Sequence, residues 1–159
     1  MKLKHNIKKF YYWIPAVFWI IVIFIMGSVR IDFNGENINL VSRILFVLKK
    51  FLYLRRKTCF FYIFLSENLD RFYHAFEYFI LTVFIFYAIK KTRDAVMKEN
   101  IFLTAMIVIS IGILDELHQI FIPTRYCSIY DFLADGIGML LMVLFLTVFE
   151  LTIKRQNVI

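Results

Sequence analysis

The chain alternates between long apolar stretches and shorter segments rich in charged residues. The apolar stretches lie at residues 10–29, 72–89, 101–119 and 132–153. Each is about 20 residues long, and a helix of that length crosses the roughly 30 Å hydrocarbon core of a bilayer. The first stretch follows a basic start and has no small-x-small cleavage site after it, so we expect a retained anchor. The pattern predicts an all-α fold, an integral membrane bundle of four transmembrane helices in a single domain over residues 1–159.

The segment between the first two stretches, residues 41–65, is basic and amphipathic. Cations recur at Arg43, Lys50 and Lys57, and apolar residues fill most of the positions between them. Wound as a helix, this segment places a basic stripe beside an apolar surface. Such a helix is typical of the membrane interface, where its cations face lipid phosphates. A fifth span is the alternative, but charged residues interrupt the segment too often for one.

The composition supports a membrane location and narrows the choice of partners. Hydrophobic residues make up 61% of the chain, compared with about 45–50% in soluble domains, and the mean hydropathy is +0.71. The net charge of +7 favours anionic membrane lipids as partners. Nucleic acid is not expected, because the basic residues flank apolar stretches and no nucleic-acid motif is present.

Cys59 and Cys127 are expected to be free thiols, with one disulfide bridge between them as the alternative.

The polar residues near the spans belong mostly to one membrane face. Four crossings bring the start of the second span, the end of the third and the start of the fourth to the same face. Residues three or four apart share a side of a helix, so three polar helix sides can form one pocket. These residues are His74, Glu77 and Tyr78 on the second span, Asp115, Glu116, His118 and Gln119 on the third, Arg125 and Ser128 in the connection, and Asp131 and Asp135 on the fourth.

Both chain ends are predicted to lie on the opposite face, which we expect to be the cytoplasmic one. Lys and Arg residues divide almost evenly between the two faces, so the positive-inside rule does not decide the orientation by total count.

The small residues of the third and fourth spans are expected to let helices approach closely. They are Gly112, Ala134, Gly136 and Gly138, of which Ala134 and Gly138 have the small-xxx-small spacing.

Three segments resemble the signature of the VanZ-like membrane proteins. They are HAFEY at 74–78, DELHQIFIPTR at 115–125, and Ser128 and Asp131 followed by DGIG at 135–138. The resemblance extends roughly from Trp13 to Glu150. It implies a small multi-pass protein of the bacterial cell envelope, located in the cytoplasmic membrane. The family is named for a member associated with resistance to the glycopeptide antibiotic teicoplanin, so the resemblance implies a location and a phenotype rather than a reaction.

One hypothesis for the polar pocket is an enzyme active site. His118 or His74 would act as general base, oriented by Asp115 or Glu77, and Arg125 would hold a phosphate or carboxylate of a lipid-linked substrate. A metal-dependent version would use both histidines and one or two carboxylates to hold a divalent cation such as zinc or manganese. The candidate catalytic residues are His118, Asp115, Glu116, His74 and Glu77.

Two other hypotheses require no chemistry. In the first, the pocket recognises the headgroup of a lipid or envelope precursor, or a drug. In the second, the polar groups only join helices, although interhelical hydrogen bonds in membranes contribute about 0.6–2 kcal/mol each and do not by themselves explain so many ionisable residues. The candidate binding residues are Arg125, Gln119, Ser128, Asp131, Asp135 and Tyr78.

Overall fold

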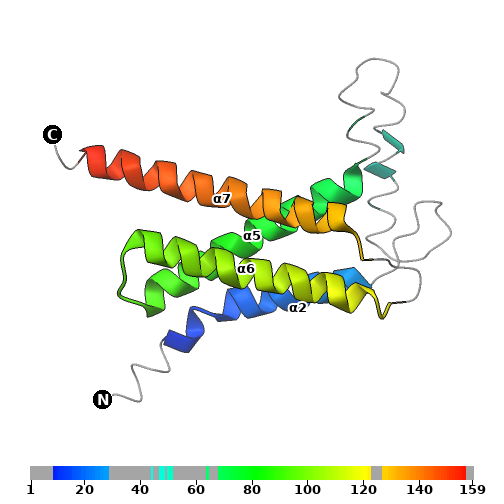
Figure 1. The fold of residues 1–159 in the computed structure, drawn as a ribbon, viewed down its shortest axis with the longest axis horizontal. Helices are drawn as coiled ribbons and strands as arrows, with labels where there is room; N and C mark the ends of the chain where they lie inside the picture. Colours follow the sequence, from blue (N-terminus) through cyan, green and yellow to red (C-terminus); the bar gives the residue numbers. More distant parts are fainter. Residues whose placement is uncertain are drawn as a thin grey trace.

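Four long helices make up most of the described part of the chain. The computed structural model describes residues 9–28, 44, 47–48, 50–51, 64, 68–122 and 127–156. The helices are α2 (Ile14–Ser28), α5 (Leu69–Thr92), α6 (Met97–Gln119) and α7 (Ile129–Gln156). Figure 1 shows that α2 and α6 end at the end of the bundle where α5 and α7 begin.

Each of the four helical segments is long and apolar enough to cross a membrane. The segments are Lys9–Ser28, Leu69–Thr92, Met97–Gln119 and Ile129–Thr152. The protein is therefore an all-α, multi-pass membrane bundle, as the hydropathy pattern predicts. The last three helices begin a few residues earlier than predicted. Asp70, Glu99 and Asp131 occupy their first turns, where an acid is stabilised by the positive end of the helix.

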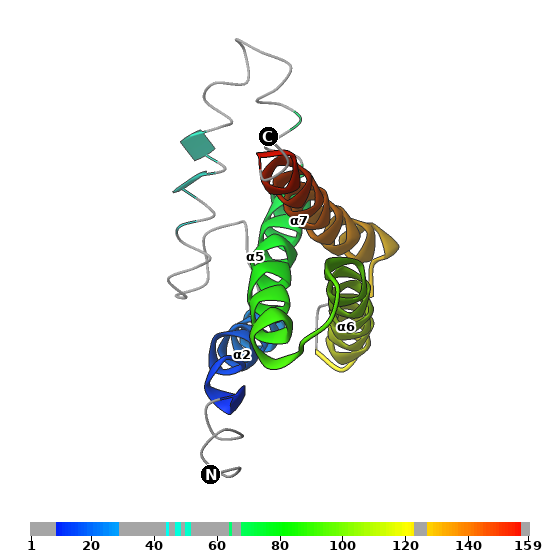
Figure 2. The same ribbon diagram turned by 90° about the vertical axis from the view of Figure 1, so that its left-hand side faces the viewer.

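Helix α5 is central and packs against α2, α6 and α7 (Figures 1 and 2). Its most extensive contact is with α7, and the two backbones approach closely at Gly138. A Cβ atom at this position would lie 2.0 Å from the Ala75 carbonyl oxygen. Gly138 therefore sets the distance between α5 and α7. The same expectation for Gly136 was wrong, because a Cβ atom there would meet nothing within 4 Å.

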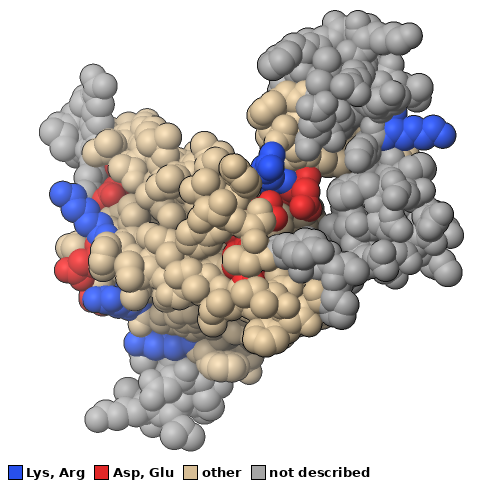
Figure 3. Space-filling view, turned by 45° about the vertical axis from the view of Figure 1, so that its right-hand side comes forward, with Lys and Arg blue, Asp and Glu red and all other residues tan. Residues whose placement is uncertain are grey.

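The apolar residues divide between a packed core and the outer surface of the bundle. Leu140, Leu144 and Phe145 on α7 are each about 60% exposed. They belong to a wide apolar surface, which would be a liability on a soluble monomer but is ordinary in lipid. Charged side chains gather mainly toward the ends of the helices (Figure 3). The packed core includes Ile23, Leu81, Ile85, Ile89 and Val108.

Some of the sequence predictions concern residues outside the described part of the chain. These residues include Arg125, Cys59 and most of the interfacial segment at 41–65. The interfacial helix and the anion-binding role of Arg125 therefore stay predictions. Cys127 is described, and its thiol is free and exposed.

Candidate functional site

A group of buried polar side chains lies toward the end of the bundle where α5 and α7 begin. A Cβ atom on Gly112 of α6 would lie 3.4 Å from the Tyr78 ring and 3.6 Å from Asp135 Oδ2, so groups from α5 and α7 meet beside α6. Figure 3 shows acidic side chains in a hollow of this end, with a basic side chain beside them. Three helices thus bring polar groups to one region. The members, each no more than 5% exposed, are His74, Glu77, Tyr78, Asp115, Glu116, Gln119 and Asp135.

His74 and Asp135 form a buried contact between α5 and α7. His74 Nδ1 lies 3.0 Å from Asp135 Oδ1, and both side chains are almost inaccessible. With a carboxylate as acceptor, Nδ1 carries the proton, and this hydrogen bond fixes the tautomer and the orientation of the ring. The sequence hypothesis instead oriented the histidine through Asp115 or Glu77. The structure differs because Gly138 brings α7 directly against the side of α5 that carries His74.

Glu77 and Asp115 have other partners. The Tyr73 hydroxyl donates a hydrogen bond of 2.5 Å to Glu77 Oε1. Gln119 Nε2 donates a hydrogen bond of 3.1 Å to Asp115 Oδ2, one turn earlier on α6. Helix α2 closes this side of the site, since a Cβ atom on Gly27 would lie 3.1 Å from Asp115 Oδ1. These contacts hold the two carboxylates in place.

Ser128 caps the start of α7. Its Oγ accepts a hydrogen bond of 3.3 Å from the Asp131 backbone N–H, which is the pattern of an N-cap residue. Glu116 Oε2 accepts a hydrogen bond of 2.7 Å from the Ser128 backbone N–H and so ties α6 to α7.

Desolvation and a hydrogen bond to Glu116 raise the pKa of the Cys127 thiol. The thiol is therefore protonated at neutral pH and is a weak nucleophile.

His118 occupies a different part of the bundle. Its ring packs against Phe24 of α2, with 5.3 Å between the ring centroids. It lines a groove between α2 and α6 together with Ile20 and Ser28. Among the described residues, the side chains placed to share a cation include His74 but not His118. The metal site that the sequence suggested, built on both histidines, is therefore not formed.

Several buried polar atoms have no hydrogen-bond partner among the described residues. They include the Tyr78 hydroxyl, Asp135 Oδ2 and Gln119 Oε1. An unpaired buried polar group costs about 1–3 kcal/mol. A cavity of about 20 Å³ beside Tyr78 and Asp135 has room for about one water molecule, which can satisfy both groups. A set of polar residues that served only to join helices would pair its atoms more completely, so the arrangement favours a site that takes water or a ligand.

Comparison with known families identifies the class of protein. The sequence profile of the VanZ/LLP1 family matches residues 12–150. The chain belongs to the VanZ/LLP1 family. The match confirms the resemblance carried by the three sequence segments, and it spans nearly the same part of the chain. Comparisons with curated proteins and with solved structures found no match.

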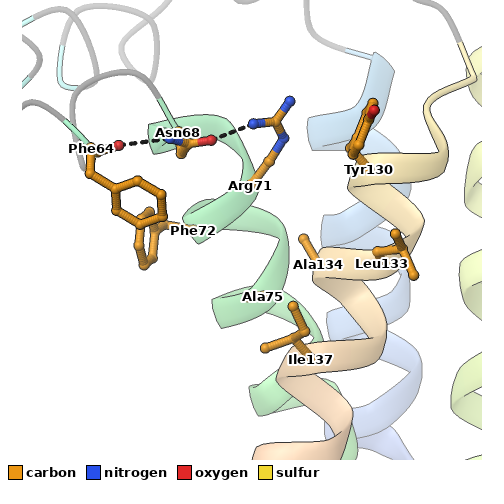
Figure 4. A pocket seen from close by; sticks show the side chains of 9 residues that line it. All are labelled: Phe64, Asn68, Arg71, Phe72, Ala75, Tyr130, Leu133, Ala134 and Ile137. Carbon is orange, nitrogen blue, oxygen red and sulfur yellow. Dashed lines mark hydrogen bonds between the residues drawn. The ribbon is translucent and has the colours of Figure 1, made fainter.

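The site of this VanZ-family protein includes two residues, Asn68 and Asp70, that were not predicted from the sequence because they precede the predicted start of the second span. Asp70 lies four residues before His74 on α5, a spacing that could have revealed it. Asn68 and Arg71 lie beside it at the end of the helix. The Arg71 guanidinium donates a hydrogen bond to the Asn68 side chain and lies 5.0 Å from the centroid of the Tyr130 ring. Figure 4 shows the guanidinium beside Asn68.

Proposed function

We propose that this VanZ-family protein binds an anionic envelope lipid or lipid-linked precursor. The headgroup would lie at the polar end of the bundle and a hydrocarbon chain between α5 and α7. The observation that carries this proposal is a groove of about 320 Å³ between those helices. It is lined by Phe64, Asn68, Arg71, Phe72, Ala75, Tyr130, Leu133, Ala134 and Ile137.

The groove is polar at one end and apolar along the rest of its length, as a binding site for an amphipathic ligand would be. Figure 4 shows Asn68 and Arg71 at one end, and Ala75, Ala134 and Ile137 further along the helices. The two alanines line the groove on the surface along the contact of α5 with α7, and the wall there is apolar. A hydrocarbon chain along this wall would place its headgroup beside the guanidinium.

Arg71 is suited to recognise a phosphate. Its guanidinium is planar and always charged, and it can donate two parallel hydrogen bonds to phosphate oxygens. The contacts with Asn68 and Tyr130 restrict its orientation before a ligand arrives, which lowers the entropy lost on binding. Arg125, which lies outside the described residues, would supply a second cation in the same role.

A catalytic function is the second candidate, and the His74–Asp135 contact favours it. A buried carboxylate that orients an imidazole is the usual arrangement of a general base. The substrate would be a phosphate or acyl ester of the bound lipid. His74→Gln is expected to abolish turnover of a labelled lipid-linked substrate and to retain lipid binding. Unchanged turnover in this variant would exclude His74 as the base.

We further propose that the protein lies in the bacterial cytoplasmic membrane with both termini inside. Lys90 and Lys91 lie in the last turn of α5, and Arg93 follows in the short connection to α6. These cations favour the cytoplasmic side for this end of the bundle. The polar site would then face the cell exterior, where envelope precursors and glycopeptides meet. Labelling of a cysteine introduced at Asp94 tests the orientation, and teicoplanin susceptibility with and without the protein tests the link to resistance.

The headgroup contact leads to a quantitative prediction. Arg71→Ala is expected to lower the affinity for an anionic phospholipid about tenfold, since one charged hydrogen-bonding group contributes about 1.5–3 kcal/mol. Native mass spectrometry of the detergent-solubilised protein, titrated with phosphatidylglycerol, measures the retained lipid. The matched control is Arg93→Ala, which removes an exposed guanidinium paired with Glu99 at 3.5 Å near the opposite membrane face and should leave binding unchanged.

The groove itself is tested by the same titration with a bulky residue. Ile137→Trp fills the groove and should reduce binding of both anionic and zwitterionic lipid. Leu141→Trp, one turn further along α7, is its control, because both side chains are 55% exposed and only Ile137 lines the groove. Equal lipid binding by the Ile137 and Leu141 variants would refute the groove as the chain site.

A further inference from the structure

We propose that Asp70, His74 and Asp131 form a binding site for a divalent transition-metal cation, with Asp135 holding the histidine in the ligating orientation. The site joins the first turns of α5 and α7 at the membrane face. It does not depend on lipid binding, because the inference rests on different residues from those that line the groove.

The donor atoms already lie close together. One ring nitrogen of His74, one carboxylate oxygen of Asp70 and one of Asp131 all lie within 4.8 Å of one another. A cation held at about 2.0–2.2 Å from each donor draws such atoms somewhat closer. Asp70 and Asp131 are only partly buried, so small rotations of their side chains can close the site. Water can complete the coordination from the open side.

The buried contact behind the histidine is an independent indication of a metal site. His74 is only 4% exposed, and its Nδ1 is engaged by Asp135 at 3.0 Å. Nε2 is then the nitrogen left to ligate a cation. Histidines that bind metals commonly donate their other N–H to a carboxylate, which fixes the ring and makes it a better ligand. A simple pair of helix-terminal acids would not require this support.

The charge of the site also calls for a cation. The carboxylate oxygens of Asp70 and Asp131 come from different helices and lie within 4.8 Å of each other. The structure shows no Lys or Arg ion pair with either acid among the residues that it describes. The nearby Arg71 guanidinium instead contacts Asn68 and Tyr130. Two carboxylates so close repel each other, and a bound cation relieves this repulsion.

The ligand set indicates which cation would bind. One imidazole nitrogen and two carboxylate oxygens suit Mn²⁺ or Zn²⁺ better than Ca²⁺, which prefers oxygen ligands alone. A cation here would lie beside the mouth of the lipid groove and could neutralise the acids that otherwise repel a phosphate.

A Mn²⁺ titration of the full-length protein, solubilised in detergent and first treated with a chelator, tests the site without added lipid. Electron paramagnetic resonance of free Mn²⁺ and isothermal calorimetry are both suitable. The wild-type protein should bind one equivalent saturably. Asp70→Asn and Asp131→Asn should each lower the affinity at least tenfold, and Asp135→Asn should lower it about 10–100-fold. The control Asp94→Asn, an exposed acid in the α5–α6 connection, should bind as the wild type does.

Two results would overturn the proposal. One is a wild-type protein that binds neither Mn²⁺ nor Zn²⁺ saturably, and the other is an unchanged affinity in both the Asp70 and Asp131 variants. These two positions are partly exposed, so their variants should fold even if His74 variants do not. Because no lipid is added, failure here leaves the lipid titration unaffected, and failure of the lipid titration leaves the metal site intact.

Discussion

Gly138→Ala is expected to prevent assembly of the folded bundle. The added methyl group would lie 2.0 Å from the Ala75 carbonyl oxygen and 2.8 Å from its carbon. Backbone atoms of α5 cannot rotate away as a side chain would, so the two helices must separate. Overpacking usually costs about 1–3 kcal/mol, and we expect this variant to exceed that range. Fluorescence-detected size exclusion and thermal unfolding in detergent measure the loss.

Gly136→Ala is the matched control for this substitution. It introduces the same methyl group two residues away on the same helix, where no atom lies within 4 Å. Alanine favours a helix over glycine by about 1 kcal/mol in water, so this variant should be as stable as the wild type or slightly more stable. If the Gly138 variant unfolded at the same temperature as the Gly136 variant, the described contact between α5 and α7 would be wrong.

The second large effect is expected at the buried contact between His74 and Asp135. Removing one partner of a buried pair costs about 3–5 kcal/mol when the remaining group keeps its charge. A neutral hydrogen bond between membrane helices typically contributes only about 0.6 kcal/mol. We expect His74→Ala and Asp135→Ala each to destabilise the protein by about 3 kcal/mol, and the double variant to lose much less than their sum.

A double-mutant cycle of thermal or chemical unfolding in detergent micelles measures this coupling. A value near 2–3 kcal/mol would show that the two residues act as a strongly interacting unit. Additive losses would mean that they stabilise the bundle separately, and the orientation of the imidazole would then need another explanation. Thr82→Ala and Val108→Ala, two buried positions outside this pair, provide an independent additive reference.

The spans were predictable because a bilayer imposes a length and a composition on every crossing segment. The clustering of His74, Glu77, Asp115 and Asp135 was predictable for a related reason, since alternating crossings fix which helix ends share a face. The small-xxx-small spacing identified Gly138 correctly. Gly136 was included only because it is small, and it points to a different side of α7, where no neighbouring helix meets it.

The partner of the histidine was not predictable from the sequence. Asp115 and Glu77 were reasonable candidates by spacing, but the choice depends on which helices are neighbours and how each is rotated. Because α5 packs closely against α7, His74 contacts Asp135. Because α2 lies beside the end of α6, His118 contacts Phe24. Asp70 was missed for a different reason. Hydropathy placed the start of the second span at residue 72. The helix begins earlier, at Leu69, with a polar first turn that hydropathy does not detect.

The proposed function requires that the groove between α5 and α7 hold a lipid whose headgroup lies at the polar end of the bundle. Electron cryo-microscopy of the protein in nanodiscs of phosphatidylglycerol, with a rigid binding fragment attached to aid alignment, tests it most directly. We expect a phosphate density within hydrogen-bond distance of the Arg71 guanidinium and a hydrocarbon chain that runs past Ala75 and Ile137. A groove filled by protein side chains, in a map that resolves lipids elsewhere around the bundle, would contradict it.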